Sequence, residues 1–364
     1  MPDFALASPT VGSGSYLPDD VHILLRPVML DPVGVQEKER FIQTHQKHYS
    51  EMISQEHAPS AVHMALFEQA MSQNALRMAE DVQSLALALA ERYRVGTIAL
   101  VSFVRAGLPL GVLLRRALIG LGRDACHYGI SIVRDRGIDK IALESIIARH
   151  GAENMVFVDG WTGKGAIADE TRRYLAGDRR FAGEPRLVVL ADPCGHAWLA
   201  ASADDWLIPS GILGATVSGL VSRSIWPVQG GMHGGVVYSH LRELDVTRLF
   251  IERIEHARAS VQVSSATPWT AGHANALRQH AKGVVDRLAA RFAVSNLNRI
   301  KPGIAEATRA VLRRVPDQVL VRDRAGADVR LLMHLADTAG IDVQEVGGEL
   351  GPYGAATIIR SVSR

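Results

Sequence analysis

The chain has 364 residues, of which 47% are hydrophobic and 21% are charged, and its formal net charge is +2. This length and composition predict a globular protein of two domains with a sizeable core. The small net charge excludes a protein that is basic throughout, although it leaves room for a local RNA-binding patch.

Cysteine usage and apolar patterning bear on localisation. The two cysteines, Cys126 and Cys194, are too few for a disulfide framework and fit a reducing cytoplasm. No apolar stretch approaches the roughly 20 residues of a membrane helix, and the N-terminus lacks the pattern of a signal peptide. We therefore expect a cytoplasmic protein without membrane contact, and we also expect a homo-oligomer.

The first half of the chain alternates between helix and strand patterns. Residues 1–60 are expected to pack on the core as an N-terminal extension, and apolar residues at helical spacing follow from 61 to 94. Strands are predicted at 97–103 and 127–133, and each leads through a turn into a helix, at 108–121 and from about 138 to 150. This order predicts an α/β fold with a mainly parallel sheet and helices on both faces.

The most informative stretch is a strand at 155–158 that ends in Asp159 and a glycine-rich turn before the next helix. Open α/β sheets bind their ligands at such carboxyl ends of strands, and the free N–H groups of the turn can hold a phosphate. The nucleotide-triphosphatase pattern GxxxxGK[ST] is excluded, because Gly165 follows Lys164 where that pattern needs a hydroxyl. An ordinary tight turn without a ligand remains the alternative.

The second half is predicted to contain a domain boundary. Residues 61–262 are assigned to the main domain, residues 263–294 to a linker and a helix, and residues 295–364 to a small α/β domain. A strand at 186–191 ends in the sequence Asp-Pro-Cys-Gly-His, which contains Cys194. This cysteine is either a reactive thiol or a small buried residue at a strand end.

The strand, carboxylate and glycine turn together resemble the diphosphate-sugar loop of type I phosphoribosyltransferases. The resemblance implies that Asp159 is catalytic, that it orients the ribose, and that Mg²⁺ is held mainly by the substrate, with no dedicated protein ligands. It also implies substrate-binding residues for the 5′-phosphate and the pyrophosphate, namely Thr162, Gly163, Lys164 and Gly165 for the first and Arg105 and Gly107 for the second. The usual acidic pair of that family is here reduced to Asp159-Gly160.

Near the start of the last domain, residues 303–309 resemble the opening RNA-binding helix of the Pelota superfamily. That resemblance implies RNA contacts from Gly303, Glu306 and Arg309. Ala305 stands where the superfamily has an asparagine that contacts a base, so low sequence specificity is expected. A purely structural role for this helix is the alternative.

Several separated segments, HYSEM, SFVRAGLP, VFVDGWTGKGAI, ADPCG and HGG, are together similar to one bacterial family. Its members occur in tellurite-resistance and stress operons, combine a phosphoribosyltransferase-like domain with a Pelota-type tail, and are sometimes named StiP cysteine proteases. The resemblance therefore implies two different activities.

We considered three hypotheses for function. The main prediction is a phosphoribosyltransferase, a pentosyl transferase that uses phosphoribosyl diphosphate, Mg²⁺ and an unidentified base or nucleoside-like acceptor. The first alternative is a cysteine protease with Cys194 as the nucleophile and His233 as a base, since a thiolate needs an adjacent base. The second alternative is a non-catalytic regulator that binds RNA.

Overall fold

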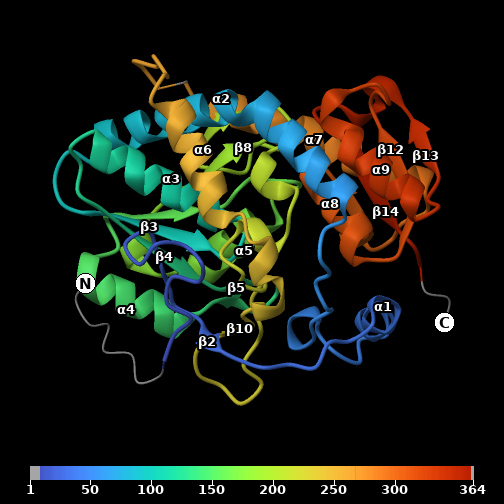
Figure 1. Cartoon of the computed structure of the whole chain (residues 1–364), viewed down its shortest axis with the longest axis horizontal. Coiled ribbons are helices and arrows are strands. Elements are labelled where there is room, and N and C mark those ends of the chain that lie inside the picture. The colour runs from blue at the N-terminus through green and yellow to red at the C-terminus, as the bar shows by residue number, and fades with distance from the viewer. Residues whose placement is uncertain (1–8, 267, 362–364) are drawn as a thin grey trace.

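The structure is a computed structural model and describes residues 9–266 and 268–361. Its centre is a six-stranded sheet in which all neighbouring strands are parallel, in the order β1-β4-β3-β7-β8-β9 (Figure 1). The strands are β1 (His22–Ile23), β3 (Ile98–Phe103), β4 (Ala125–Ile130), β7 (Met155–Val158), β8 (Leu187–Ala191) and β9 (Leu199–Ser202). The predicted parallel sheet is confirmed, and β1 joins it from within the N-terminal 60 residues.

Helices cover both faces of this sheet, as predicted. Alternation of side chains along β3 places Leu100 in one apolar core and Val101 in the other. The first core is covered by α2 (Ala61–Arg92), α3 (Gly107–Gly120) and α6 (Thr247–Arg258), and the second by α4 (Lys140–His150) and α5 (Ala166–Leu175). The helix α4 begins two residues later than predicted because Asp139 caps it, accepting hydrogen bonds from the N–H groups of Ile141 and Ala142.

Smaller elements surround the carboxyl edge of the sheet. These are α1 (Val35–Gln43), the parallel pair of β2 (Arg26–Pro27) and β10 (Gly234–Gly235), and the antiparallel pair of β5 (Ile132–Val133) and β6 (Gly137–Ile138). They build one side of the region into which β3, β4 and β7 point.

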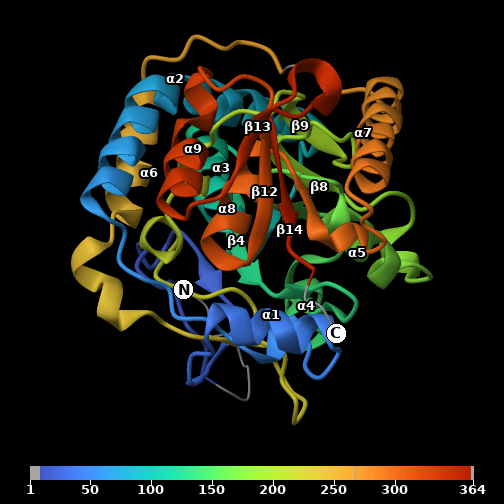
Figure 2. The same ribbon diagram turned by 90° about the vertical axis from the view of Figure 1, so that its right-hand side faces the viewer.

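The last part of the chain folds around its own four-stranded sheet, in the order β11-β14-β12-β13 (Figure 2). Its strands are β11 (Ile300–Pro302), β12 (Pro316–Val321), β13 (Val343–Glu345) and β14 (Ala355–Ile359), and its helices are α8 (Ile304–Arg313) and α9 (Arg330–Thr338). The long helix α7 (Ala271–Arg291) precedes it. We call the unit that begins at β11 the C-terminal domain.

The C-terminal domain is hydrogen-bonded to the rest of the protein at both ends of α8. At its first turn, the carboxylate of Asp205 accepts from Ile304 N at 2.9 and 3.0 Å and from Gly354 N at 2.8 Å. Just beyond its last turn, Arg314 forms a bidentate ion pair with Glu39 of α1 at 2.5 and 2.8 Å. Among the described residues, no helix has the length and apolar character needed to cross a membrane.

Candidate active site and interdomain cleft

A cleft of about 1100 Å³ lies between the carboxyl edge of the main sheet, the segment around α1 and the C-terminal domain. Residues that directly follow β3, β5 and β7 form its floor, and residues of β11 and α8 form the facing wall. This is the position at which open α/β sheets bind ligands. The sequence placed Asp159 at this edge of the sheet, but it gave no indication that α8 lies opposite.

The glycine turn contacts the C-terminal domain directly. A Cβ atom on Gly163 would lie 2.9 Å from Cγ of Glu306 and 3.1 Å from the carbonyl oxygen of Pro302. The ammonium group of Lys164 donates to the carbonyl oxygens of Leu297 and Ile300, the latter at 3.2 Å. The turn expected to hold a phosphate therefore uses a glycine and a lysine to dock a domain.

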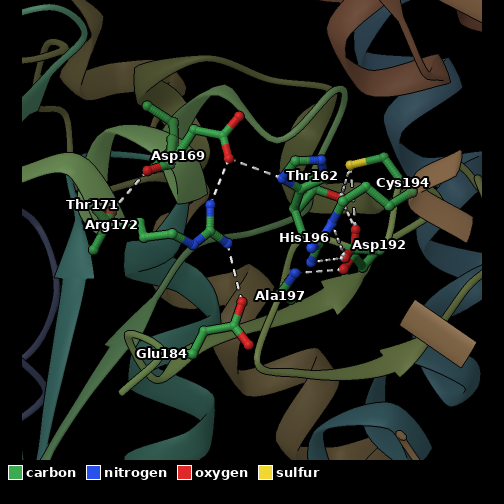
Figure 3. A network of polar contacts seen from close by, with 12 residues as sticks. Thr162, Asp169, Thr171, Arg172, Glu184, Asp192, Cys194, His196 and Ala197 are labelled. Carbon is green, nitrogen blue, oxygen red and sulfur yellow. Dashed lines mark hydrogen bonds and ion pairs between the residues drawn. The ribbon is translucent and has the colours of Figure 1, made fainter. Parts of the chain in front are cut away.

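The residue before Gly163 connects the cleft to a buried thiol (Figure 3). The hydroxyl of Thr162 donates to Asp192, and the thiol of Cys194 donates to Thr162 Oγ1 at 3.1 Å and to Asp192 Oδ1 at 3.4 Å. The other carboxylate oxygen of Asp192 accepts from Ala197 N at 2.6 Å. Burial, reinforced by the charge of Asp192, raises the pKa of the Cys194 thiol well above its usual value, so the resting thiol is protonated.

A histidine lies two residues beyond this thiol. The carboxylate of Asp169 accepts a hydrogen bond from His196 Nδ1 at 3.1 Å, and it also pairs with Arg172 at 2.6 Å. Burial alone would raise the pKa of Asp169, but the contacts with His196 and Arg172 outweigh it and the pKa is lowered. Because an ionised carboxylate only accepts, Nδ1 carries the proton and Nε2 is left as the basic nitrogen.

The last glycine of the turn makes room for this imidazole. A Cβ atom on Gly165 would lie 2.3 Å from both Cγ and Nδ1 of His196, and its φ of +81° is in the left-handed region. Cys194, His196 and Asp169 thus come from the ends of β8 and α5, and the turn before α5 is shaped to hold the ring.

Asp159 stands at the cleft floor, as predicted from its place after β7. Its Oδ1 accepts a hydrogen bond from Gly160 N at 2.8 Å. Burial raises the pKa of Asp159 to about 7, against the opposing effects of that hydrogen bond and of Arg309. A carboxyl group that is about half protonated near neutral pH is a weak substitute for the acidic pair that it was expected to replace.

Arg105 and Gly107, predicted to hold pyrophosphate, have partners within the protein. Nη2 of Arg105 forms an ion pair with both carboxylate oxygens of Glu56, at 2.7 and 3.0 Å, and Nη1 donates to the carbonyl oxygen of Val221 at 2.9 Å. A Cβ atom on Gly107 would lie 2.2 Å from the carbonyl oxygen of Val158, so this glycine permits the close approach of α3 to the end of β7. This close packing explains why a glycine occupies position 107, and no bound ligand is needed to explain it.

Two of the three residues predicted to contact RNA, Glu306 and Arg309, line the cleft. The third, Gly303, has a φ of +93° directly before α8. The guanidinium of Arg309 is 3.5 Å from Glu306 and lies over the ring of Trp161, 5.5 Å from its centroid. Glu306 and Arg309 therefore face the main domain.

The predicted pairing of Cys194 with His233 is not formed. His233 Nδ1 hydrogen-bonds Ser131 Oγ at 2.5 Å, its backbone N–H donates to Asp139 at 2.6 Å, and its ring packs on Trp226. The partners of the Cys194 thiol are Thr162 and Asp192. His196 was visible in the sequence two residues away, but Asp169, 27 residues earlier, carries no local signal that connects it to His196.

A second cysteine–histidine contact was not predicted. The thiol of Cys126 lies 3.5 Å from His150 Nε2, and the hydroxyl of Tyr128 lies 2.9 Å from the same nitrogen. Cys126 sits at the amino end of β4, away from the carboxyl edge and the cleft. Burial raises the pKa of Cys126 to about 11, so this thiol is also protonated at neutral pH.

Within the described part of the chain, no group of three or more His, Cys, Asp or Glu side chains can hold a metal ion. An ion carried by a substrate needs no such group, so the expected Mg²⁺ stays an untested prediction.

The main domain is an α/β fold in which Cys194, His196 and Asp169 come from neighbouring segments, and comparison with known proteins gives its family. Residues 14–255 match the family model described as tellurite-like stress resistance cysteine protease StiP, and residues 279–361 match the PELOTA RNA binding domain. A curated relative from Acinetobacter baylyi, named cysteine protease StiP, is 52% identical over 365 residues and covers 97% of this chain and 95% of its own. The chain belongs to the StiP family.

Similarity to solved structures is weak. Two structures of the hypoxanthine phosphoribosyltransferase of Trypanosoma cruzi, one with the product IMP, are each 15% identical with a TM-score of 0.28. They cover 36% and 34% of this chain and 80% and 75% of their own chains.

The main functional prediction, a phosphoribosyltransferase, is therefore wrong. The nearly full-length relative is named a cysteine protease, and the family carries the same description, so the expected glycosyl transfer and the binding of phosphoribosyl diphosphate are withdrawn. The physical reason is visible in the cleft. The glycine turn that resembled a phosphate loop is occupied by contacts with Glu306, Pro302 and His196.

Proposed function

We propose that the chain is a latent cysteine peptidase in which Cys194 is the nucleophile, His196 the general base and Asp169 the group that orients the base. The observation that carries the proposal is the hydrogen bond between His196 Nδ1 and Asp169, which leaves Nε2 free two residues from Cys194. Family membership supports the reaction class. Of the two cysteines, only Cys194 adjoins residues at the floor of the cleft.

The reaction follows from these groups. Nε2 of His196 takes the thiol proton, and the thiolate attacks the carbonyl carbon of a peptide bond. The carbon–nitrogen bond breaks as the amine leaves with the proton from His196, and an acyl group remains on sulfur. Water, deprotonated by the same imidazole, then releases the acid and restores the thiol. General-base help of this kind contributes about 10²–10⁴-fold in rate.

Latency is required because the resting thiol is covered and protonated. Cys194 is 1% exposed and packs with residues of α7 and the C-terminal domain, including Val284 and Tyr353. Its bonded partners are Thr162 and Asp192, so it has to leave them before His196 can take its proton. A buried protonated thiol is a poor nucleophile.

The helix α7 holds the segment that would have to move. Gly195, between the thiol and the imidazole, has a φ of +67°, and a Cβ atom on it would lie 1.9 Å from the carbonyl oxygen of Ala274. Arg278 donates to the carbonyl oxygen of Gly195 from Nε at 3.2 Å and from Nη2 at 2.7 Å. Release of α7 would free Gly195 to turn the thiol towards His196.

Hydrolysis of fluorescein-labelled casein tests the proposal. We expect Arg278→Ala to raise turnover several-fold by loosening the Gly195 segment, whereas Arg287→Ala, an exposed change on the same helix, leaves it unchanged. In the Arg278→Ala background, Cys194→Ala abolishes hydrolysis and His196→Ala lowers it by about 100-fold or more. Cys126→Ala is the matched cysteine control and retains activity.

Two results would overturn the proposal. One is hydrolysis that survives Cys194→Ala but is lost in Cys126→Ala, which would move the nucleophile to the pair formed with His150. The other is the absence of hydrolysis in both the wild type and Arg278→Ala, with the thiol of Cys194 still unreactive towards iodoacetamide by mass spectrometry.

A further inference from the structure

The interdomain cleft concentrates positive charge that the peptidase proposal does not use. Twelve lysine or arginine side chains line it, against four carboxylates, whereas the whole chain has a formal net charge of only +2. A cleft lined mostly by one sign of charge focuses the field on its interior and attracts the opposite charge. The cleft is therefore suited to a ligand with several negative charges.

The positive charge of Lys301 in β11 is not balanced by an ion pair among the described residues. Its side chain is buried, and among the described residues it forms no hydrogen bond or salt bridge. Burial and the nearby charges of Arg134 and Lys164 lower the pKa of Lys301 well below its usual value, and Glu306 opposes them. Because Lys301 lines the cleft, an anion bound there would compensate its charge.

Lys164 and Arg134, the cations near Lys301, also have more positive than negative charge around them. Burial and the charge of Arg134 lower the pKa of Lys164 to about 8, again against Glu306. Arg134 has its closest side-chain partner in Asn298 Oδ1 at 3.4 Å, which is a neutral acceptor. Three cations from three different segments of the chain thus share one carboxylate.

Aromatic rings lie among these cations. The guanidinium carbons of Arg134 and Arg223 lie 5.0 and 5.2 Å from the centroid of the Tyr49 ring. The guanidinium carbon of Arg309 lies 5.5 Å from the centroid of the Trp161 ring. Tyr49 and Trp161 are both half-buried and both line the cleft. Cations interleaved with aromatic faces are the combination with which proteins bind single-stranded nucleic acids.

We propose that the cleft binds single-stranded RNA, with phosphates at Lys301 and Arg134 and bases against Tyr49 and Trp161. RNA binding is an activity separate from the proposed peptidase activity. The proposal places half of the RNA site in the main domain. A cleft of about 1100 Å³ has room for a few nucleotides. The wall formed by α8 belongs to the segment that matches an RNA binding domain.

Glu306 gives a reason for RNA rather than DNA. Burial would raise its pKa, but Arg309 and Lys301 outweigh burial and keep the pKa below the usual value, so the carboxylate is ionised. An ionised carboxylate only accepts hydrogen bonds, and a ribose 2′-hydroxyl is a donor that deoxyribose lacks. Glu306 lines the cleft, and its charge opposes the lowering of the pKa of both Lys301 and Lys164.

Fluorescence anisotropy of a labelled 12-nucleotide single-stranded RNA with the full chain tests this proposal. We expect Lys301→Gln to weaken binding about tenfold or more and to reduce the slope of log K against log salt by about 0.7, the value for one phosphate of a single strand. Lys282→Gln is the matched control, since its side chain is 76% exposed on α7, outside the cleft. If Lys301→Gln unfolds the protein, Arg134→Gln is measured in its place, because Arg134 has a long hydrogen bond of 3.4 Å to Asn298 within the protein.

Competition with other nucleic acids completes the test. Single-stranded DNA should bind more weakly than RNA, and Glu306→Gln should reduce that difference. The proposal is overturned by the absence of salt-sensitive binding, by wild-type affinity in both cleft variants, by a preference for duplex RNA, or by displacement with inorganic triphosphate at equal concentration. Binding is read without hydrolysis, so its failure leaves the peptidase proposal standing.

Discussion

Gly163 and Glu306, which are 143 residues apart in sequence, lie so close together that no side chain fits between them. A Cβ atom on Gly163 would lie 2.9 Å from Cγ of Glu306. Through this contact, the turn after β7 and the helix α8 hold each other in place. The same turn reaches Cys194 through Thr162 and His196 through Gly165, so the position of the C-terminal domain and the state of the thiol are physically connected.

The first prediction is that Gly163→Ala destabilises the protein by about 1–3 kcal/mol, the usual cost of forcing an extra methyl group into a packed contact. The Pro302 carbonyl oxygen, 3.1 Å from the new methyl group, belongs to backbone and cannot simply rotate away. Urea unfolding measures the change. Gly272→Ala is the control, because no atom would lie within 4 Å of a Cβ atom at that position and an alanine favours the helix α7. Equal stability of Gly163→Ala and wild type would contradict the contact.

The second prediction concerns the attachment of the C-terminal domain. Asp205→Ala removes the acceptor for the N–H groups of Ile304 and Gly354, and we expect a loss of about 1–3 kcal/mol because buried donors are left unpaired. Limited proteolysis should then cut between residues 259 and 270, before α7, faster than in wild type. Asp204→Ala removes the neighbouring carboxylate, which is 70% exposed, and should change stability by less than about 0.5 kcal/mol.

The main fold could be predicted from the sequence because its strands are apolar runs separated by turn residues. The strand at 98–103 and the turn after Val158 have strong local patterns, so their type and order followed from residue chemistry. The short strand β1 was missed as part of the sheet, since two residues carry no periodicity and its pairing with Tyr128 and Gly129 is set by tertiary contacts.

The site was harder to predict because one local pattern is compatible with two uses. Glycines at 163 and 165 can leave N–H groups open to a phosphate, or they can make room for a neighbouring side chain. In the structure the neighbours are Glu306 and His196, and neither contact has a local sequence signal. Family comparison, rather than the turn, separated the protease from the transferase.

The third prediction concerns pH. Burial raises the pKa of Asp81 in α2 to about 7, and its Oδ2 has no hydrogen-bond partner among the described residues. The unfolded carboxyl has a pKa of about 3.9, so between these values the folded state binds more protons and its stability falls as pH rises from about 4 to about 7. Asp81→Asn should remove this slope and add about 2 kcal/mol of stability at pH 7, a figure reduced for partial exposure. Asp286→Asn, at an exposed position, should leave the slope intact. Urea unfolding at several pH values measures both.

The last prediction has the opposite pH sign and concerns the partly buried pair of Arg105 and Glu56. Burial would raise the pKa of Glu56, but Arg105 leads the charges that lower it to about 2. The unfolded glutamate has a pKa of about 4.3, so the pair stabilises the protein fully above that value and the stabilisation is lost as pH falls towards 2.

Arg105→Met removes one partner of this pair, and we expect it to destabilise the protein by about 1–3 kcal/mol at pH 7, because Glu56 loses a charged hydrogen-bond donor and keeps Arg313 at 3.8 Å. The loss should shrink as pH falls from about 4 towards 2, since protonation of Glu56 removes its charge. Arg253→Met breaks the half-exposed pair with Glu68 and should cost less than about 1 kcal/mol at any pH. A loss in Arg105→Met that does not depend on pH would mean that the arginine acts through packing and its bond to Val221 rather than through the charge of Glu56.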